Sequence, residues 1–441
     1  MRRFVLIALV LVLALILISA GTAWYLANDE AFLKSQLSKV VLEQTGRELA
    51  VDGPLTLDIG RQTSIEASGI RFQNAAWAEQ ADMVRVGRLA VTIDIPSLWD
   101  ETIIIPELSI EDCSIDLLKN ENGEANWDVL PEAEPDPEPP PPRTALPVQG
   151  NHVRIRNCSL DLDAPERERP LQIRLADLEL RLSDENRWVG DGAGSINDEE
   201  FSLSGWYGPV GAFYLGKPVE HQLQLSLGDI SLESSGTIED ALSFSGANVQ
   251  ARFHGPDIGK VLHNFSAPPV SEGAFDFRLE LDSEGEVTTL ELIGDLGSLN
   301  ARASGEFDRL KDTRTGHITA TVDGPDLEAM GQAFGVQGLV SDAFSLKADA
   351  NFSEGLTTVK YATLETSMDR VSINGDLGTG ADLANTALDI DLTSDEIGRW
   401  IPALNQQPKN IGPIKLEGSL ASDPEGLFST DSEFTLGDST I

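Results

Sequence analysis

Apolar and polar residues alternate one by one along most of this chain, and no other feature constrains its fold as strongly. Successive side chains of a β-strand point to opposite faces of a sheet, so this alternation predicts strands with one apolar and one polar face. Glycine, Asn-Gly and Asp-Gly interrupt the alternation at intervals typical of hairpins. Clear examples are Val91 with Ile93, Ile115 with Leu117, Leu178 with Leu180, and Leu223 with Leu225. The sequence therefore predicts a mostly β fold in which an elongated, curled antiparallel sheet forms a groove.

The charge and the scarcity of some residue types exclude several classes of function. The chain has 32 Lys and Arg against 72 Asp and Glu, for a net charge of −40. A nucleic-acid-binding protein needs clustered cations to neutralise phosphates, and the sequence has no such cluster. Two Cys exclude a zinc site built from four Cys, and the two Cys and five His do not have the spacing of a site built from two Cys and two His. The His residues are scattered and no Gly-x-Ser-x-Gly motif occurs, so we expect neither an enzyme nor a metal or cofactor.

The N-terminal segment predicts export. Phe4–Ala27 contains no charged residue and is long enough to cross a bilayer as a helix. Arg2 and Arg3 precede this run while Asp29 follows it, so the positive-inside rule keeps the N-terminus in the cytoplasm. A cleaved signal peptide is the alternative, but the apolar run is longer than the usual central region of such peptides. We therefore expect residues 1–28 to anchor the chain in a membrane, with the bulk of the chain outside the cytoplasm.

Three further segments follow the anchor. The stretch from Asp29 to Thr45 has apolar residues at helical spacing, and Gly46 is placed to end this helix. With the strands that come after the helix, it makes up a segment over residues 29–130. Residues 131–150 are rich in proline, which cannot continue a strand inside a sheet, so they predict a linker or crossing loop. Alternation resumes over residues 151–254.

The second half of the chain contains a repeat of about 70 residues. The strand that begins at Phe275 aligns with the strand that begins at Phe344. Short helical segments recur in step, starting at Ile258, Leu327 and Ile397, and Asp257 and Asp326 precede two of them as N-cap residues. We expect one repeat over 255–323, a second over 324–393, and the start of a third, incomplete one over 394–441. Each repeat would hold a short helix and about five strands, and would pack on its neighbours.

The N-terminal third carries an ordered set of short motifs. In chain order these are Thr45-Gly46-Arg47, Gly53-Pro54-Leu55, Asn74-Ala75-Ala76-Trp77 with Met83, Val86-Gly87-Arg88-Leu89, Ser97-Leu98, and Asn122-Gly123-Glu124-Ala125-Asn126-Trp127. Together with the apolar N-terminal segment, this pattern resembles the N-terminal region of the AsmA family of bacterial envelope proteins. The later repeats resemble the strand-rich body that AsmA and TamB proteins share. Gly46, Arg47, Gly123, Asn126 and Trp127 are the residues that carry the resemblance most directly.

The resemblance implies a single-pass protein of the bacterial inner membrane with its bulk in the periplasm. Its partners would be phospholipid, the inner membrane through the N-terminal helix, and outer-membrane or envelope proteins, with no nucleic acid. The implied function is guidance of phospholipids towards the outer membrane along an apolar β-groove, in support of envelope integrity. The alternative is a factor for outer-membrane protein assembly, or an envelope scaffold, without lipid conduction.

The alternation also predicts which residues would line such a groove. In the strand over residues 344–352, for example, Phe344, Leu346 and Phe352 share one side while Lys347 lies on the other. The candidate groove residues are Val91, Ile93, Leu223, Leu225, Phe275, Phe277, Leu279, Phe344, Leu346 and Phe352.

Two local features leave alternatives open. Cys113 and Cys158 both precede a Ser-Ile/Leu-Asp-Leu segment and share the parity of apolar residues. They are either two buried thiols or, as an oxidising compartment favours, a disulfide that spans the proline-rich segment. The run Gly190-Asp191-Gly192-Ala193-Gly194 is similar to a phosphate-binding loop but leads into a strand pattern, so we expect a hairpin turn there.

Overall fold

The computed structural model describes residues 29–440, apart from 101, 130–147, 166, 168, 198, 211, 213–215, 241–244, 260–272, 286, 309–314, 334–335, 354–355, 379–382, 405–411, 423–427 and 437–438. The predicted anchor and most of the predicted proline-rich linker lie outside the described residues. The chain divides into two compact units. Unit 1 holds residues 1–215 and 225–228, and unit 2 holds residues 216–224 and 229–441. Both are mostly β, as the alternation predicts.

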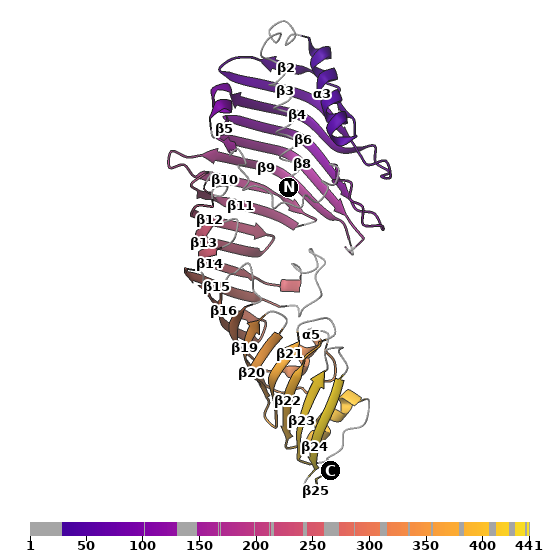
Figure 1. Ribbon diagram of the computed structural model, residues 1–441, viewed down its shortest axis with the longest axis vertical. Coiled ribbons are helices and arrows are strands. Elements are labelled where there is room, and N and C mark those ends of the chain that lie inside the picture. The colour runs from indigo at the N-terminus through magenta and orange to yellow at the C-terminus, as the bar shows by residue number, and fades with distance from the viewer. Residues whose placement is uncertain are drawn as a thin grey trace. The chain divides into compact units, whose positions relative to one another are not determined.

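Unit 1 is an open sheet with one long helix against it (Figure 1). Its elements are α3 (Glu30–Thr45), β1 (Leu49–Val51), β2 (Leu55–Asp58), β3 (Gln62–Gln73), β4 (Asp82–Asp94), η1 (Ile95–Trp99), β5 (Ile103–Ile105), β6 (Glu107–Leu118), β7 (Val148–Gly150), β8 (His152–Asp163), β9 (Leu171–Leu182), β10 (Trp188–Ile196) and β11 (Glu199–Gly208). Strand β12 (Val219–Leu227) is divided between the two units. Within the part of the chain that the structure describes, no helix is both long and apolar enough to cross a membrane.

The prediction of wholly antiparallel pairing is wrong in unit 1. Strands β3, β4 and β6 pair antiparallel, as do β8, β9, β10 and β11, but β6 and β8 pair parallel. The short strands β5 and β7 are parallel as well. A hairpin can join only antiparallel strands, whereas the connection from β6 to β8 contains the long proline-rich segment. The chain therefore returns to the starting end of β6 before it enters β8, and the two strands point the same way.

The helix α3 ends where its sequence predicts. The Asp29 carboxylate accepts a hydrogen bond from the Phe32 amide at 3.2 Å, which satisfies one of the free donors of the first turn. Gly46 closes the helix with φ 69°, a left-handed conformation that glycine adopts without strain, and its amide donates to the Leu42 carbonyl.

The apolar face of α3 covers the first strands of the sheet and forms the main core of unit 1. Leu33 packs in a cluster with Leu55, Ile65, Ala67, Val91 and Ile93, while Val41 packs with Leu49, Phe72, Met83 and Val129. Ile93 is only 1% exposed and Val91 only 6%. Both side chains, which the sequence places in the groove, therefore lie in the core beneath α3 and not on an accessible apolar face.

The glycine-rich segment over residues 190–194 is the interior of β10, not a hairpin turn. It pairs with β9 on one side and β11 on the other. The glycines are needed because large neighbours lie across them. A Cβ on Gly192 would lie 2.9 Å from Cδ1 of Leu178. One on Gly194 would overlap the main-chain carbonyl oxygen of Arg174 and lie 2.9 Å from Cε1 of Phe201. The prediction of a turn is wrong because these glycines make room for groups on the neighbouring strands.

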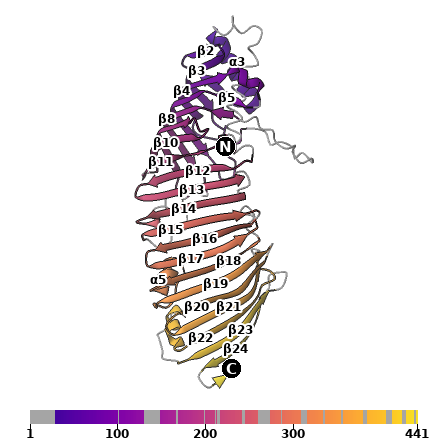
Figure 2. The same ribbon diagram turned by 90° about the vertical axis from the view of Figure 1, so that its left-hand side faces the viewer.

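Within unit 2, the strands of the sheet follow one another in chain order (Figure 2). Its elements are β13 (Ile230–Asp240), β14 (Ser245–Gly255), β15 (Phe275–Glu284), β16 (Val287–Leu296), β17 (Leu299–Phe307), β18 (Gly316–Gly324), α5 (Leu327–Ala333), β19 (Phe344–Ser353), β20 (Leu356–Glu365), β21 (Asp369–Gly378), β22 (Ala387–Ser394), η3 (Ile397–Leu404), β23 (Ile414–Ser422), β24 (Phe428–Leu436) and β25 (Ser439–Thr440). Each neighbouring pair from β13 to β25 is antiparallel. Among the described residues, four strands lie between Ile258 and α5, and again between α5 and η3, where about five were expected.

Candidate functional site

One face of the unit 2 sheet carries three apolar rows that run across its strands. The strand register places one residue of each strand from β14 to β23 side by side in each row. The first row is Phe253, Phe277, Gly294, Ala301, Val322, Leu346, Leu364, Val371, Leu392 and Leu416. The second is Ala251, Leu279, Leu292, Ala303, Ala320, Ala348, Ala362, Ile373, Ile390 and Gly418. The third is Val249, Leu281, Leu290, Gly305, Ile318, Ala350, Val359, Gly375, Leu388 and Leu420.

These rows make an apolar face that is continuous across ten strands, which at about 4.8 Å per strand corresponds to roughly 43 Å. We call it the unit 2 apolar face. Charged residues such as Arg278, Glu280 and Glu291 alternate with the row residues and are exposed on the opposite face. The two faces of this sheet therefore differ sharply in polarity over their whole length.

The short helices cover only part of the first row. Leu327 of α5 is fully buried in a cluster with Val340 and Phe344. Half-buried residues that pack on this cluster include Val322, Leu346 and Leu364 of the first row, together with Trp400 of η3. In the second and third rows, Leu279, Leu281, Leu290 and Leu292 are only half-buried, so part of each side chain stays accessible.

Val91 and Ile93 lie in the core of unit 1, and the other candidate groove residues fall into three groups. Phe277, Leu279 and Leu346 lie on the unit 2 apolar face, with Phe277 and Leu346 in the same row. Phe275 and Phe344 are buried, at 3% and 5% exposure. The remaining residues are Leu223, which is 39% exposed, and Leu225 and Phe352, which are half-buried.

Leu281, Leu290 and Leu292 extend the accessible rows and are not among the predicted groove residues. The alternation in Thr289-Leu290-Glu291-Leu292 could have identified the last two.

The motif residues of the N-terminal third meet at a buried polar junction. Asn126 is fully buried, and its side-chain oxygen accepts a hydrogen bond from the Leu118 amide at 2.9 Å. Its amide nitrogen donates to the Asp116 carbonyl at 2.7 Å and to Oδ1 of Asn74 at 2.9 Å. Arg47 donates to the main-chain carbonyl of Asn126. The junction therefore ties the end of α3, the turn after β3 and the end of β6 together.

The other motif residues have local roles at this junction. Burial of the guanidinium lowers the pKa of Arg47, which stays a cation at any physiological pH. Gly46 closes α3, Gly123 has φ 83° in the turn after β6, and Trp127 is half-buried beside Asn126. These contacts assign the motif a structural role: it fixes the helix on the sheet.

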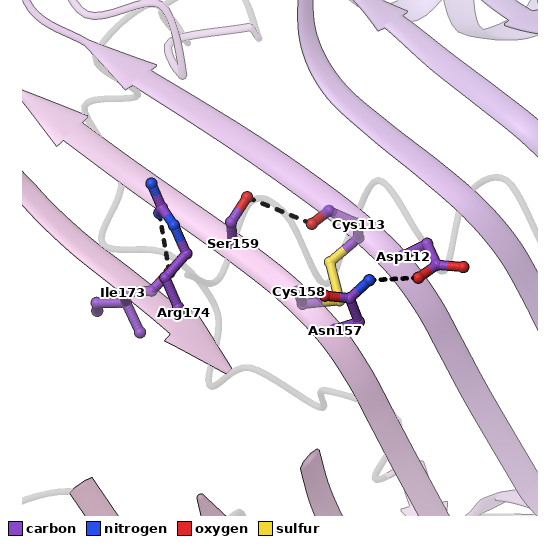
Figure 3. Close-up of a disulfide and its surroundings, with 7 residues drawn as sticks. All are labelled: Asp112, Cys113, Asn157, Cys158, Ser159, Ile173 and Arg174. Carbon is purple, nitrogen blue, oxygen red and sulfur yellow. Dashed lines mark hydrogen bonds between the residues drawn. A yellow bond between two sulfur atoms is a disulfide. The ribbon is translucent and has the colours of Figure 1, made fainter. Parts of the chain in front are cut away.

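A disulfide joins Cys113 of β6 to Cys158 of β8, with 4.4 Å between the Cα atoms (Figure 3). The two residues are direct partners in the parallel register. Just before them, Asp112 and Asn157 both have left-handed backbone conformations, and Nδ2 of Asn157 donates to Oδ1 of Asp112. The bond therefore fixes the register of the parallel pair of long strands, which no hairpin could fix.

Open hollows lined by charged and polar residues occur among the described residues of both units. A hollow of about 1050 Å³ in unit 1 is lined in part by Arg85, Ser159 and Arg174, and one of about 480 Å³ in unit 2 by Arg278 and Glu291. Within the described ranges, no three His, Cys, Asp or Glu residues are close enough to hold a metal ion.

His residues in the described part of the chain bond to polar side chains of other strands. His152 bonds Glu179 at 2.7 Å, His317 bonds Asp349 at 2.8 Å, and His221 bonds Ser234 at 2.8 Å. Hydrogen bonds from His152 and Arg154 lower the pKa of Glu179 to about 2, so this group is an anion and no proton donor near neutrality.

Equivalent hydrogen bonds occur where the short helical segments begin. The amides of Ile258, Leu327 and Ile397 donate to the carbonyls of Gly273, Asp342 and Gly412, at 3.2, 2.9 and 3.3 Å. The carboxylates of Asp257 and Asp326 also accept main-chain amides of their own turns, as N-cap residues do.

Comparison with known proteins identifies the N-terminal part of the chain. Residues 1–189 match the AsmA family. The match includes the apolar N-terminal segment, α3, and the strands up to the start of β10. It confirms the resemblance that the motifs from Gly46 to Trp127 predict. Searches of curated proteins and of solved structures each found no match.

Proposed function

Given that residues 1–189 match the AsmA family, we propose that this chain guides phospholipids towards the outer membrane of a bacterium. In this proposal, Phe4–Ala27 anchors the chain in the inner membrane and the rest lies in the periplasm. The unit 2 apolar face holds the acyl chains while the head groups stay in water. The chain carries no catalytic role and needs no cofactor. The proposal also takes the second half of the chain to be built from units of about 70 residues, which the equivalent hydrogen bonds of Ile258, Leu327 and Ile397 support.

The observation that carries the proposal is the continuity of the three apolar rows from β14 to β23. An acyl chain that leaves a bilayer exposes apolar surface to water, at a cost of about 0.8 kcal/mol per CH₂ group. A row of half-buried Leu, Ile and Ala side chains offers equivalent contacts at every strand. An acyl chain can therefore move along the face without a step that exposes it fully.

The first test asks whether lipid touches this face. A photocrosslinking amino acid is placed at Leu279, in the second row, in the full chain expressed in a bacterial inner membrane. The matched control is Glu280, the next residue of β15, which is exposed on the opposite face. Leu346 is a poorer probe because it packs against the α5 cluster. We expect phospholipid at position 279 and none at 280, measured by mass spectrometry of the adducts. Equal lipid capture at both positions would contradict the proposal.

The second test changes the chemistry of the face. Leu279→Glu places a carboxylate among apolar neighbours that stay partly accessible, so we expect the fold to tolerate it. A passing acyl chain would have to desolvate that charge, which costs several kcal/mol. Leu279→Glu should therefore fail to complement a strain that depends on this protein, whereas Glu280→Gln should complement. If position 279 captures unfolded outer-membrane proteins and no lipid, the assembly-factor alternative replaces lipid guidance.

A further inference from the structure

Phenylalanine residues of this sheet stand opposite glycine on a neighbouring strand. In unit 2 the register pairs Phe275 with Gly255, Phe277 with Gly294, Phe307 with Gly316, and Phe344 with Gly324. In every pair, a Cβ built on the glycine would meet the ring of its partner: at 3.1 Å for Phe275, 2.7 Å for Phe307 and 2.6 Å for Phe344, and in direct overlap with Cδ1 for Phe277. Each ring therefore lies across its glycine, in the space that a side chain would occupy, as aromatic rings do when they cover a strand glycine.

One of these four pairs lies on the accessible part of the unit 2 apolar face. Phe275, Phe307 and Phe344 are buried, whereas Phe277 is half-buried. Phe277 lies in the first row between Phe253 and Gly294, and beyond Gly294 the row continues with Ala301. A ring that lies flat over Gly294 adds little height to the sheet. A ring that stood upright at the same place would project from the face by most of its length.

We propose that Gly294 acts as a positioning residue that keeps the ring of Phe277 flat, so that an acyl chain can pass over this point. The inference rests on the proposed function and deepens it, because it names a residue on which passage depends. The site takes the acyl part of a phospholipid, and Phe277 contacts that chain with the face of its ring. Leu279 and Leu292, in the adjacent row, flank the same passage.

The central variant is Gly294→Ala, read out by lipid capture from the photocrosslinker at Leu279. The added methyl group would overlap the ring, so the ring must leave its flat position and enter the path. We expect capture to fall by about tenfold, which corresponds to ~1.4 kcal/mol. Phe277→Ala combined with Gly294→Ala should restore capture, because no ring remains to obstruct the path.

Gly324→Ala is the matched control. It makes the same kind of overlap, with Phe344, but that ring is buried beneath α5. We expect Gly324→Ala to lower the midpoint of thermal unfolding and to leave lipid capture at position 279 unchanged. If Gly294→Ala likewise lowers the thermal midpoint and leaves lipid capture unchanged, its effect is purely structural and the inference is wrong.

Leu292→Phe keeps the inference testable if Gly294→Ala does not fold. Its cross-strand partners are Leu279 and Ala303, and neither is a glycine over which a ring could lie flat. Leu292→Phe should therefore reduce capture as Gly294→Ala does. Wild-type capture in folded Gly294→Ala, or in Leu292→Phe, would overturn the inference. Absence of capture in the wild-type chain would instead refute the proposed function itself.

Discussion

Replacement of Asn126 tests the claim that the motif near the end of β6 is structural. The side chain is fully buried and makes three hydrogen bonds, to Leu118, Asp116 and Asn74. Asn126→Ala removes all three and leaves the Leu118 amide and the Asp116 carbonyl without these partners. A buried polar group that loses its partner costs about 1–3 kcal/mol, so the two main-chain groups together predict a loss of roughly 2–6 kcal/mol. That is a large fraction of the 5–15 kcal/mol that is typical of a folded domain.

The assay combines denaturant unfolding of the full chain with hydrogen exchange of its amides. In the Asn126→Ala variant, the Leu118 amide should lose most of its protection, and unit 1 should unfold at lower denaturant. Asn122→Ala is the matched control, since Asn122 lies in the same turn but is exposed, and it should change the free energy of unfolding by less than about 0.5 kcal/mol. Asn126→Asp keeps the acceptor for Leu118 but turns an oxygen towards the Asp116 carbonyl, so it should also destabilise. A loss below about 1 kcal/mol for Asn126→Ala would refute the claim that this junction fixes α3 on the sheet.

Two further predictions concern unit 1. Replacement of both Cys113 and Cys158 by Ala opens a loop with a sequence separation of 45 residues, which corresponds to about 4 kcal/mol of chain entropy. Reductant should lower the free energy of unfolding of the wild-type chain by a similar amount and leave that of the double variant unchanged. A reductant effect on the double variant would contradict the assignment of this stability to the disulfide. Glu179 has its pKa lowered to about 2 from an ordinary value of 4.5, so its contribution to stability is complete above about pH 4.5 and is lost as the pH falls through 2. Glu179→Gln should therefore lower the thermal midpoint at pH 6 and differ progressively less from wild type towards pH 2, whereas a difference that is constant over this range would refute the role of the charge.

The sequence predicts the local structure of this protein well, because local structure follows from neighbouring residues. Alternation identifies the strands, and Asp29 and Gly46 mark the ends of α3, since each acts within one helical turn. The spacing of Ile258, Leu327 and Ile397 anticipates three similar helix starts. Cys113 and Cys158 have the same position in the alternation as their apolar neighbours, so both side chains lie on one face of the sheet. This shared face is what allows the disulfide to form.

What the sequence does not predict depends on residues that are distant along the chain. Val91 and Ile93 have the same pattern as Leu279, but α3 covers the first two and not the third. The glycines of β10 have the composition of a turn, yet they are required by close neighbours on the adjacent strands, the Leu178 side chain for Gly192 and the Arg174 main chain for Gly194. The parallel pairing of β6 with β8 cannot be read from alternation, which is the same for both strand directions.

The parallel pair also sets an order of events for folding. Most neighbouring strands in unit 1 are joined by short connections, so they can pair quickly. Leu118 and His152, by contrast, bound a connection of roughly 30 residues, and the entropy of closing it is about 2 kcal/mol greater than that of a three-residue turn. Contacts between segments that are far apart in sequence form slowly. We therefore expect the pairing of β6 with β8 to be the rate-limiting step in the folding of unit 1, after the hairpins on each side have formed.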